Sequence, residues 1–186
     1  MTGNHEHARR MLLRATQIAP NSASHHFTLG DIYHSFGDTE AAVTSYYSAL
    51  DLDPNFYAVL VNLSNSLLIL QRYTAAEGIS RRAIELVPES AEAHSNLGQA
   101  FLKQGRLTDA HRALSKSVDI APQRPDLLNN YGVLQQLIGD VGGAIESFQT
   151  ALKRDPQATL AQRNLKIAVL NSPSWDTRAL FKLHVE

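Results

Sequence analysis

Apolar and small residues recur along this chain in two alternating stripes, each with helical spacing. Within residues 91–122 the first stripe, at about 100° per residue, consists of Leu97, Gly98 and Phe101. Gln104-Gly105 then interrupts the pattern, because glycine tolerates the conformation that ends a helix. The second stripe runs through Leu107, Ala110, Leu114 and Val118. The pattern predicts a helix, a tight turn and a second helix, each about 20 Å long.

This pattern repeats every 34 residues. Prolines keep that spacing without slippage at Pro20, Pro54, Pro88, Pro122 and Pro156. An alanine stands twelve residues before each proline, at Ala8, Ala42, Ala76, Ala110 and Ala144. A constant period over most of a chain indicates one structural unit copied end to end, in which each unit packs on its neighbours.

Small residues in each unit predict where helices approach closely. Counting Ala23, Tyr57, Ala91, Pro125 and Thr159 as position 1, glycine occupies position 8 at Gly30, Gly98 and Gly132. A larger side chain there would push the helices apart, at a cost of about 1–3 kcal/mol. Position 24 is expected to fill the adjacent space with Tyr46, Leu114 and Phe148, whereas Ser80 in the second unit does not.

These residues resemble the tetratricopeptide (TPR) repeat, whose pattern asks for Leu-Gly at positions 7–8, Tyr at 11, Ala at 20, Phe or Tyr at 24, Ala at 27 and Pro at 32. The unit beginning at Ala23 supplies Leu29-Gly30, Tyr33, Ala42, Tyr46, Ala49 and Pro54. The resemblance covers roughly residues 5 to 171. It implies an all-α fold, a right-handed TPR solenoid of antiparallel helix pairs, with four full units in residues 21–156: 23–56, 57–90, 91–124 and 125–156.

The ends of the array are expected to be incomplete. Residues 1–20 supply a second helix alone, and residues 157–171 supply a first helix alone, with Lys166 at position 8. Residues 172–186 form a non-TPR tail that ends in a short amphipathic stretch. Because repeat arrays need polar caps, the apolar face of residues 1–20 requires a partner, a missing helix or a second copy of the chain. Association through the uncapped ends would give a homodimer.

Composition excludes several functions. The formal net charge is −1 and the basic residues are scattered, so the footprint of a nucleic-acid binder is missing. Cysteine is absent, which is in keeping with a reducing compartment. There is no apolar signal-peptide core in the first twenty residues and no apolar run long enough to span a membrane. We therefore expect a soluble, cytoplasmic protein that does not bind a membrane.

The sequence contains no catalytic motif. A phosphate-binding glycine loop, HExxH and GxSxG are all missing, and the eight histidines have no zinc-binding spacing. We expect the chain by itself to be no enzyme, with no cofactor and no metal site.

A row of asparagines is the main functional signal. Asn62, Asn96, Asn130 and Asn164 occupy position 6 at the 34-residue spacing, and Thr28 replaces the asparagine in the first unit. Positions 2, 6, 9 and 13 are expected about 180° from the buried stripe at positions 4, 8 and 11. Asparagine is a mediocre helix former, but its amide can pair with both the N–H and the C=O of an extended peptide. A structural role between helices, or simple solvation, is the alternative.

The asparagine row, with Ala-His-Ser-Asn-Leu-Gly at 93–98, resembles the TPR superhelix of the O-GlcNAc transferases and the bacterial SPINDLY-type proteins. The resemblance implies that the four asparagines contact the backbone of a bound polypeptide. Neighbouring candidates for this peptide-binding face are Asn65, Gln99 and Asp31, with Glu92, Lys103 and Asp126 as weaker ones. The tail from Leu170 is similar to the connection into the catalytic region of those enzymes. The expected function is a polypeptide-binding scaffold, and the alternative is the substrate-recognition region of an O-GlcNAc transferase-like enzyme whose catalytic domain is absent from this chain.

A clamp for the C-terminal carboxylate of chaperones is the other groove chemistry to consider. It requires Lys or Arg at positions 2, 5 and 6. Position 5 instead reads Phe27, Val61, Ser95, Asn129 and Arg163, and position 2 reads Ser24, Ala58, Glu92, Asp126 and Leu160. One arginine cannot form this clamp.

Overall fold

A computed structural model describes residues 21–172 of the chain, and these residues form helices without a strand. The helices are α2 (Ala23–Ser35), α3 (Thr39–Leu52), α4 (Tyr57–Ile69), α5 (Tyr73–Leu86), α6 (Ala91–Lys103), α7 (Leu107–Ile120), α8 (Pro125–Leu137), α9 (Val141–Arg154) and α10 (Thr159–Leu170). The all-α class of helix pairs is therefore confirmed. The expectations for residues 1–20 and for the tail beyond Ser172 lie outside the described residues.

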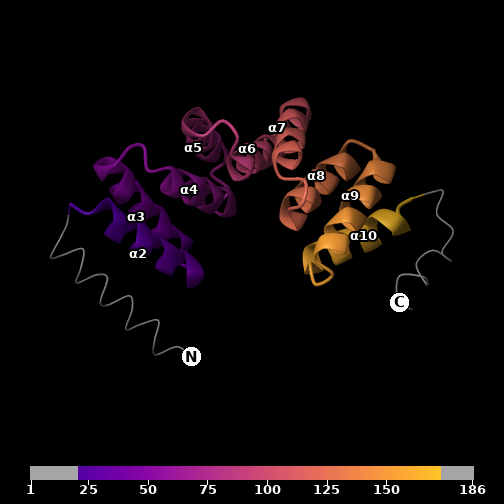
Figure 1. Cartoon of the computed structure of the whole chain (residues 1–186), viewed down its shortest axis with the longest axis horizontal. Coiled ribbons are helices and arrows are strands. Elements are labelled where there is room, and N and C mark those ends of the chain that lie inside the picture. Colours follow the sequence, from indigo (N-terminus) through magenta and orange to yellow (C-terminus); the bar gives the residue numbers. More distant parts are fainter. Residues whose placement is uncertain (1–20, 173–186) are drawn as a thin grey trace. The chain divides into compact units, whose positions relative to one another are not determined.

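The contacts divide the chain into two units, with the boundary inside α7 between Ala113 and Leu114. In unit 1, α2 to α6, each helix packs against the next one along the chain (Figure 1). The first helices of the pairs also contact one another, α2 with α4 and α4 with α6. One continuous hydrophobic core joins these helices, and its largest fully buried members include Tyr46, Leu60, Leu63 and Leu67.

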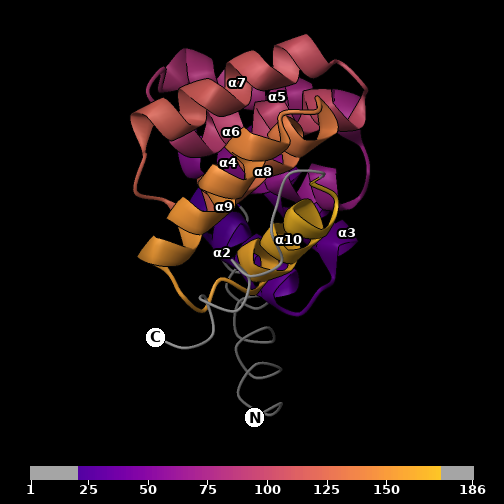
Figure 2. The same cartoon turned by 90° about the vertical axis from the view of Figure 1, so that its right-hand side faces the viewer.

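In unit 2, α9 packs against α8, and α10 packs against both (Figures 1 and 2). Phe148 of α9 is fully buried in a cluster with Leu165 and Val169 of α10. A second cluster joins Leu128 of α8 to Ala161 of α10. The first helices α8 and α10 are thereby held side by side.

Position 15 forms the turn between the two helices of each pair. Gly37, Gly105 and Gly139 have φ values of 78°, 76° and 86° there. Glycine adopts this left-handed backbone conformation without a Cβ penalty. The second pair has Gln71 at the same position, with a φ of 58°. The turn geometry is therefore kept even where the sequence does not supply glycine.

The start of several helices is fixed by a side chain that caps free backbone N–H groups. The carboxylates of Asp38 and Asp140 accept hydrogen bonds from the backbone N–H groups of Ala41 and Gly143, at 3.2 and 2.9 Å. Ser90 accepts a hydrogen bond from the N–H of Ala93 at 3.0 Å, and its hydroxyl is also paired with that of Tyr57. Turn residues thus define helix ends and link successive first helices.

The expected close packing of position 8 against position 24 is present in both units. The ring of Tyr46 lies directly against Gly30, and Cε1 of Phe148 lies 2.6 Å from the point at which a Cβ on Gly132 would stand. In the second pair both positions are serine, Ser64 and Ser80, and both are fully buried. The Ser80 hydroxyl has no hydrogen-bond partner, which is costly for a buried polar group.

Candidate functional site

Asn96 at position 6 of α6 lies in the contact between two first helices. Its Nδ2 donates hydrogen bonds to the backbone oxygen of Val61 at 3.2 Å and to Oγ of Ser64 at 2.7 Å, both on α4. The residue is 7% exposed. Asn96 therefore joins two neighbouring repeats within unit 1.

Asn62 makes the corresponding contact one repeat earlier, between α4 and α2. Its Nδ2 donates to Oδ1 of Asp31 on α2 at 2.8 Å, and the hydroxyl of Tyr46 donates to the same oxygen at 2.7 Å. Burial, with a further contribution from the Asp31 carboxylate, raises the pKa of the Tyr46 phenol well above its usual value. Asp31 is thus a shared acceptor that links α2, α3 and α4.

Asn164 repeats this arrangement in unit 2. Its Nδ2 donates to Oδ1 of Asn129 on α8 at 2.9 Å. Asn129 is buried, whereas Asn164 and the position 6 residue of α8, Asn130, are half-buried. The acceptors differ from repeat to repeat. In each case, however, the amide nitrogen of Asn62, Asn96 or Asn164 points at the preceding first helix.

These contacts correct the expected placement of position 6. The prediction that it lies opposite the buried stripe is wrong for Asn96, which is buried. The physical reason is that α6 packs against the preceding first helix, α4, as well as against the second helix α5, so that its covered sector is wider than one stripe. The hydrogen bonds do not measure peptide binding, and the peptide-binding role of the row stays a proposal.

On α4 and α6, position 9 lies more open to solvent than position 6. Asn65 on α4 is exposed, and Gln99 on α6 is half-buried, with its Nε2 at 3.5 Å from Oγ of Ser95. At position 2, Glu92 is half-buried and Asp126 is exposed. Hydrogen bonds from the guanidinium of Arg124, at 2.9 and 2.7 Å, lower the pKa of the Asp126 carboxyl below its ordinary value.

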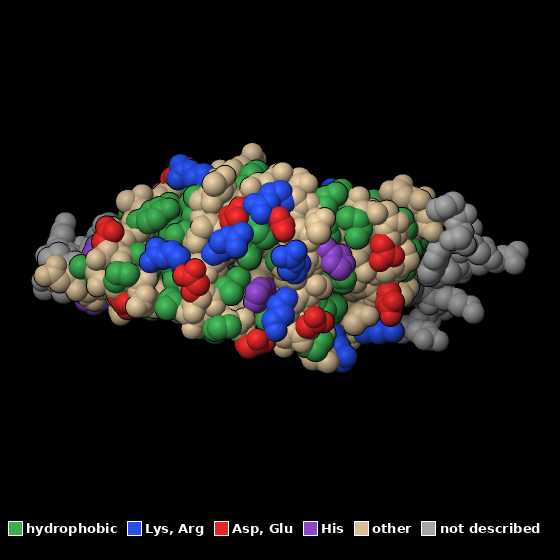
Figure 3. All heavy atoms as spheres, turned by 90° about the horizontal axis from the view of Figure 1, so that it is seen from above, with side chains coloured by type: hydrophobic (Ala, Val, Ile, Leu, Met, Phe, Trp, Pro, Cys, Tyr) green, Lys and Arg blue, Asp and Glu red, His purple; other side chains and the backbone are tan. Residues whose placement is uncertain are grey.

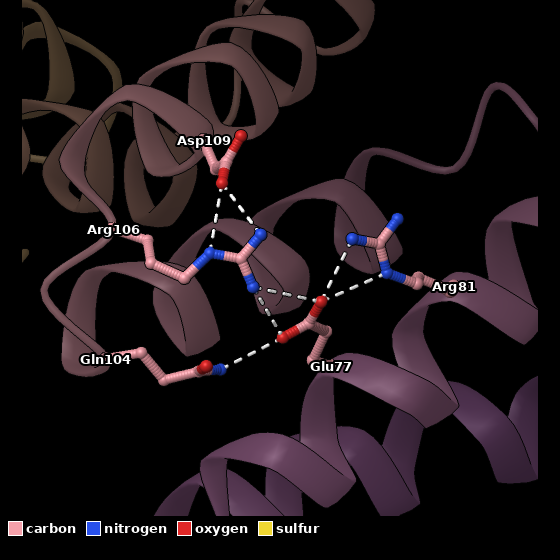
Figure 4. A network of polar contacts seen from close by, with 5 residues as sticks. All are labelled: Glu77, Arg81, Gln104, Arg106 and Asp109. Carbon is pink, nitrogen blue, oxygen red and sulfur yellow. Dashed lines mark hydrogen bonds and ion pairs between the residues drawn. The ribbon is translucent and has the colours of Figure 1, made fainter.

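A separate polar cluster lies at α5, the turn after α6 and the start of α7 (Figure 4). The carboxylate of Glu77 is paired with Arg81 at 2.9 Å and with Arg106 at 3.0 Å, and it accepts a hydrogen bond from Gln104 at 3.1 Å. Arg106 is also paired with Asp109 at 2.7 Å. Burial would raise the pKa of Glu77, but the hydrogen bonds from Arg81, Gln104 and Arg106 outweigh it, and the pKa is lowered.

The two arginines of this cluster also cover an aromatic ring. The guanidinium carbon of Arg106 lies 4.2 Å from the centroid of the Phe101 ring, and that of Arg81 lies 5.4 Å from it. Such cation–π contacts help to hold the charged guanidinium groups over the ring. With its cations already engaged, we assign this cluster to the connection of successive helix pairs and not to ligand binding.

On the face of the molecule drawn in Figure 3, basic and acidic side chains are interspersed with apolar ones, and neither charge sign dominates. Within residues 21–172, no three His, Asp or Glu side chains come close enough to share a metal ion. The helices of that same range are also too short or too polar to cross a membrane.

Comparison with known families identifies the repeat. Tetratricopeptide repeat models match residues 25–56, 61–125 and 125–158, which together cover more than half of the chain. The chain therefore belongs to the tetratricopeptide repeat family, and such proteins are generally scaffolds for protein interactions.

Several solved structures share this fold. MamA (residue 41 to its end) from Desulfovibrio magneticus RS-1 has a TM-score of 0.74 and 24% identity, over 84% of this chain and 88% of that one. YrrB, described as a TPR protein with an unusual peptide-binding site, has a TM-score of 0.69 and 21% identity, over 88% of this chain and 84% of that one. At these identities the likeness shows the fold alone.

Among curated relatives, the human protein O-mannosyl-transferase TMTC3 is 26% identical over 185 residues, covering 91% of this chain. The chain spans 20% of the length of that relative. The comparisons support the TPR resemblance, but they do not support the closer resemblance to the O-GlcNAc transferases and SPINDLY-type proteins.

Proposed function

We propose that this chain is an interaction scaffold that binds an extended polypeptide segment along the outward sides of its first helices. The observation that carries the proposal is that, within each unit, asparagine amides at position 6 are held by hydrogen bonds to the preceding first helix. Because Asn62 and Asn164 each donate their amide hydrogen to the preceding helix, their side chains are held in one orientation. A preorganised row loses less conformational entropy when a ligand binds.

The proposed contacts are hydrogen bonds to the peptide backbone. An asparagine or glutamine amide can accept from a peptide N–H and donate to a peptide C=O. The half-buried Asn62, Asn130 and Asn164 would contribute their oxygen atoms, and the more open Asn65 and Gln99 would contribute the whole amide. Asp31 would act as an acceptor beside them, and the buried Asn96 would act through the stacking of α4 and α6.

Each such contact contributes only about 0.5–1.5 kcal/mol net, so several must act together. Backbone recognition of this kind favours an unfolded or extended segment and depends little on its side chains.

We place this interaction in the cytoplasm and assign no catalytic step to the chain itself.

Selection of binders from a displayed library of random peptides on the immobilised chain tests this proposal. Recovered peptides should lose affinity for a variant that combines Asn65→Ala with Gln99→Ala. The matched control is Gln123→Ala, an exposed amide in the turn before α8 and outside the first helices themselves. Failure to recover any peptide, or equal binding by the double variant, would contradict the proposal.

A second candidate is the non-catalytic, substrate-recognition part of a protein glycosyltransferase. The match to a protein O-mannosyl-transferase over 91% of the chain favours it. One observation separates the candidates: a glycosyltransferase reading frame directly after the codon of Glu186 would favour the second. Transfer of sugar from UDP-GlcNAc by the isolated chain would contradict both, because neither assigns a catalytic step to this chain.

A further inference from the structure

The outward sides of the first helices differ in chemistry along the chain. At positions 2, 9 and 13, α2 and α6 carry polar or charged side chains throughout, and α4 is mixed, with Ala58, Asn65 and Ile69. On α8, positions 9 and 13 are Val133 and Leu137, and on α10, positions 2 and 9 are Leu160 and Ile167. We call these last four residues the apolar face of unit 2.

Three of the four residues are large and exposed to solvent, and Val133 is half-buried. Leu137 is 61% exposed, Leu160 is 64% exposed and Ile167 is 38% exposed. Single exposed leucines need no explanation, but a group on two adjacent helices marks a surface for interaction.

The four residues flank the contact between α8 and α10. Leu160, Asn164 and Ile167 share one side of α10, because residues three and four apart are neighbours on a helix. Asn164 donates its hydrogen bond across this contact to α8. On α8, Val133 packs against the core cluster that contains Leu165 of α10. The two apolar rows therefore border the same seam.

Amide groups lie within each of these rows. Asn130 precedes Val133 by three residues on α8, and Asn164 lies between Leu160 and Ile167 on α10. This combination suits a polypeptide, since the amides can pair with its backbone while the apolar side chains cover its apolar side chains.

The charge beside this face is positive. Helix α10 carries Arg163 and Lys166 and no acidic residue, and both basic residues are exposed. Arg163 lies three residues after Leu160 and four before Ile167, on the same side of the helix. The acidic residue of the α8 row, Asp126, is already paired with Arg124 at 2.7 Å. A second copy of the same face would bring like charges together, whereas an acidic ligand would be attracted.

We propose that the apolar face of unit 2 binds a polypeptide segment in which large apolar side chains alternate with acidic ones. This inference rests on the proposed function and adds the chemistry of the ligand. Apolar side chains of the segment pack on Leu137, Leu160 and Ile167, and its acidic groups lie toward Arg163.

Three short fluorescent peptides of equal length provide the test: one alternates Leu with Asp, one alternates Ser with Asp, and one alternates Leu with Lys. The Leu–Asp peptide should bind the full chain most tightly. Replacing Leu137→Ser together with Leu160→Ser should weaken that peptide about tenfold or more, as expected for central apolar contacts. The matched control replaces Leu52→Ser and Leu86→Ser, which are 41% and 40% exposed at the ends of second helices, and it should bind as the wild type does.

Three outcomes would overturn this inference: equal affinity of the Leu–Asp and Ser–Asp peptides, an unchanged affinity in the Leu137/Leu160 variant, or an equal loss in the control pair. The inference would also fail if the wild-type chain sedimented as an oligomer and the Leu137/Leu160 variant as a monomer, because a second copy would then occupy the face. If peptides bind but none of these dependences holds, the proposed function survives without this inference. If no peptide binds at all, including those of the random library, the proposed function itself fails.

Discussion

Phe148 packs so closely on Gly132 that its Cε1 atom lies 2.6 Å from where a Cβ of residue 132 would stand. A real Cβ cannot occupy that position unless the fully buried ring moves. We predict that Gly132→Ala lowers the free energy of unfolding by about 1–3 kcal/mol, the cost of overpacking a core. Urea unfolding followed by circular dichroism measures the change.

The neighbouring helix offers a control for this substitution. Gly142 in α9 has open space around the position of a Cβ. Gly142→Ala should stabilise the chain by about 0.5–1 kcal/mol, because alanine is the better helix former. If the two substitutions have equal effects, the close packing of residues 132 and 148 is not what makes glycine necessary.

Gln71 is a second position at which the choice between glycine and a larger residue affects stability. It has a φ of 58° where the equivalent residues of other pairs are glycines. The left-handed conformation costs a non-glycine residue about 1–2 kcal/mol, partly offset by the lower chain entropy of the unfolded glutamine. We therefore expect Gln71→Gly to raise the free energy of unfolding by about 0.5–1 kcal/mol. The same change at the exposed Gln123, whose φ is not positive, should lower it, and the opposite ranking would contradict this explanation.

Asn96 and Asn65 should respond differently to removal of the amide. Asn96→Ala removes two hydrogen bonds, of which the one to Oγ of Ser64 has no replacement, whereas the Val61 oxygen still accepts from the Ser64 hydroxyl at 2.8 Å. We therefore predict a loss of about 1–3 kcal/mol in the free energy of unfolding. Asn65 is exposed, and Asn65→Ala should change stability by less than about 0.5 kcal/mol while it weakens peptide binding. Differential scanning calorimetry and a peptide titration on both variants make the comparison. A stable Asn96→Ala variant would show that its hydrogen bonds carry no weight.

The Glu77 cluster predicts a pH dependence of stability. Since the folded-state pKa of Glu77 is lowered, its carboxylate stabilises the fold above the ordinary glutamate pKa of about 4.3, and this contribution is lost as the pH falls through the folded-state pKa. Glu77→Gln should therefore be less stable than the wild type at pH 7, and the difference should vanish in acid. Glu85→Gln, on the same helix and exposed, is the control and should match the wild type at both pH values. A difference that persists in acid would assign the loss to packing instead of charge.

Much of the fold followed from residue spacing. The fixed period of Pro54, Pro88 and Pro122, with small residues at position 8, was sufficient to predict helix pairs and the contact of residue 30 with residue 46. These features are local or repeat identically, so one unit predicts the next. The turn at Gln71 was less readable, because its left-handed conformation is imposed by the neighbouring helices and not by its own preference.

The candidate site was harder to predict, because the projection of a single helix does not include the preceding first helix. It placed Asn96 on an open face, whereas contact between successive first helices buries it. The acceptors Ser64 and Asn129 were missed for the same reason. One signal was available: Ser64 replaces the glycine of position 8, and a polar residue at a buried position requires a partner.

Hydrogen exchange with and without a bound peptide tests the central claim most directly, since it locates the binding surface without any substitution. A peptide selected from the random library should slow exchange in the first helices of the unit that it occupies, α2, α4 and α6 or α8 and α10, and leave α3, α5 and α9 nearly unchanged. Protection concentrated on the second helices, or none at all under saturating peptide, would contradict the assignment of the first-helix sides as the polypeptide-binding surface.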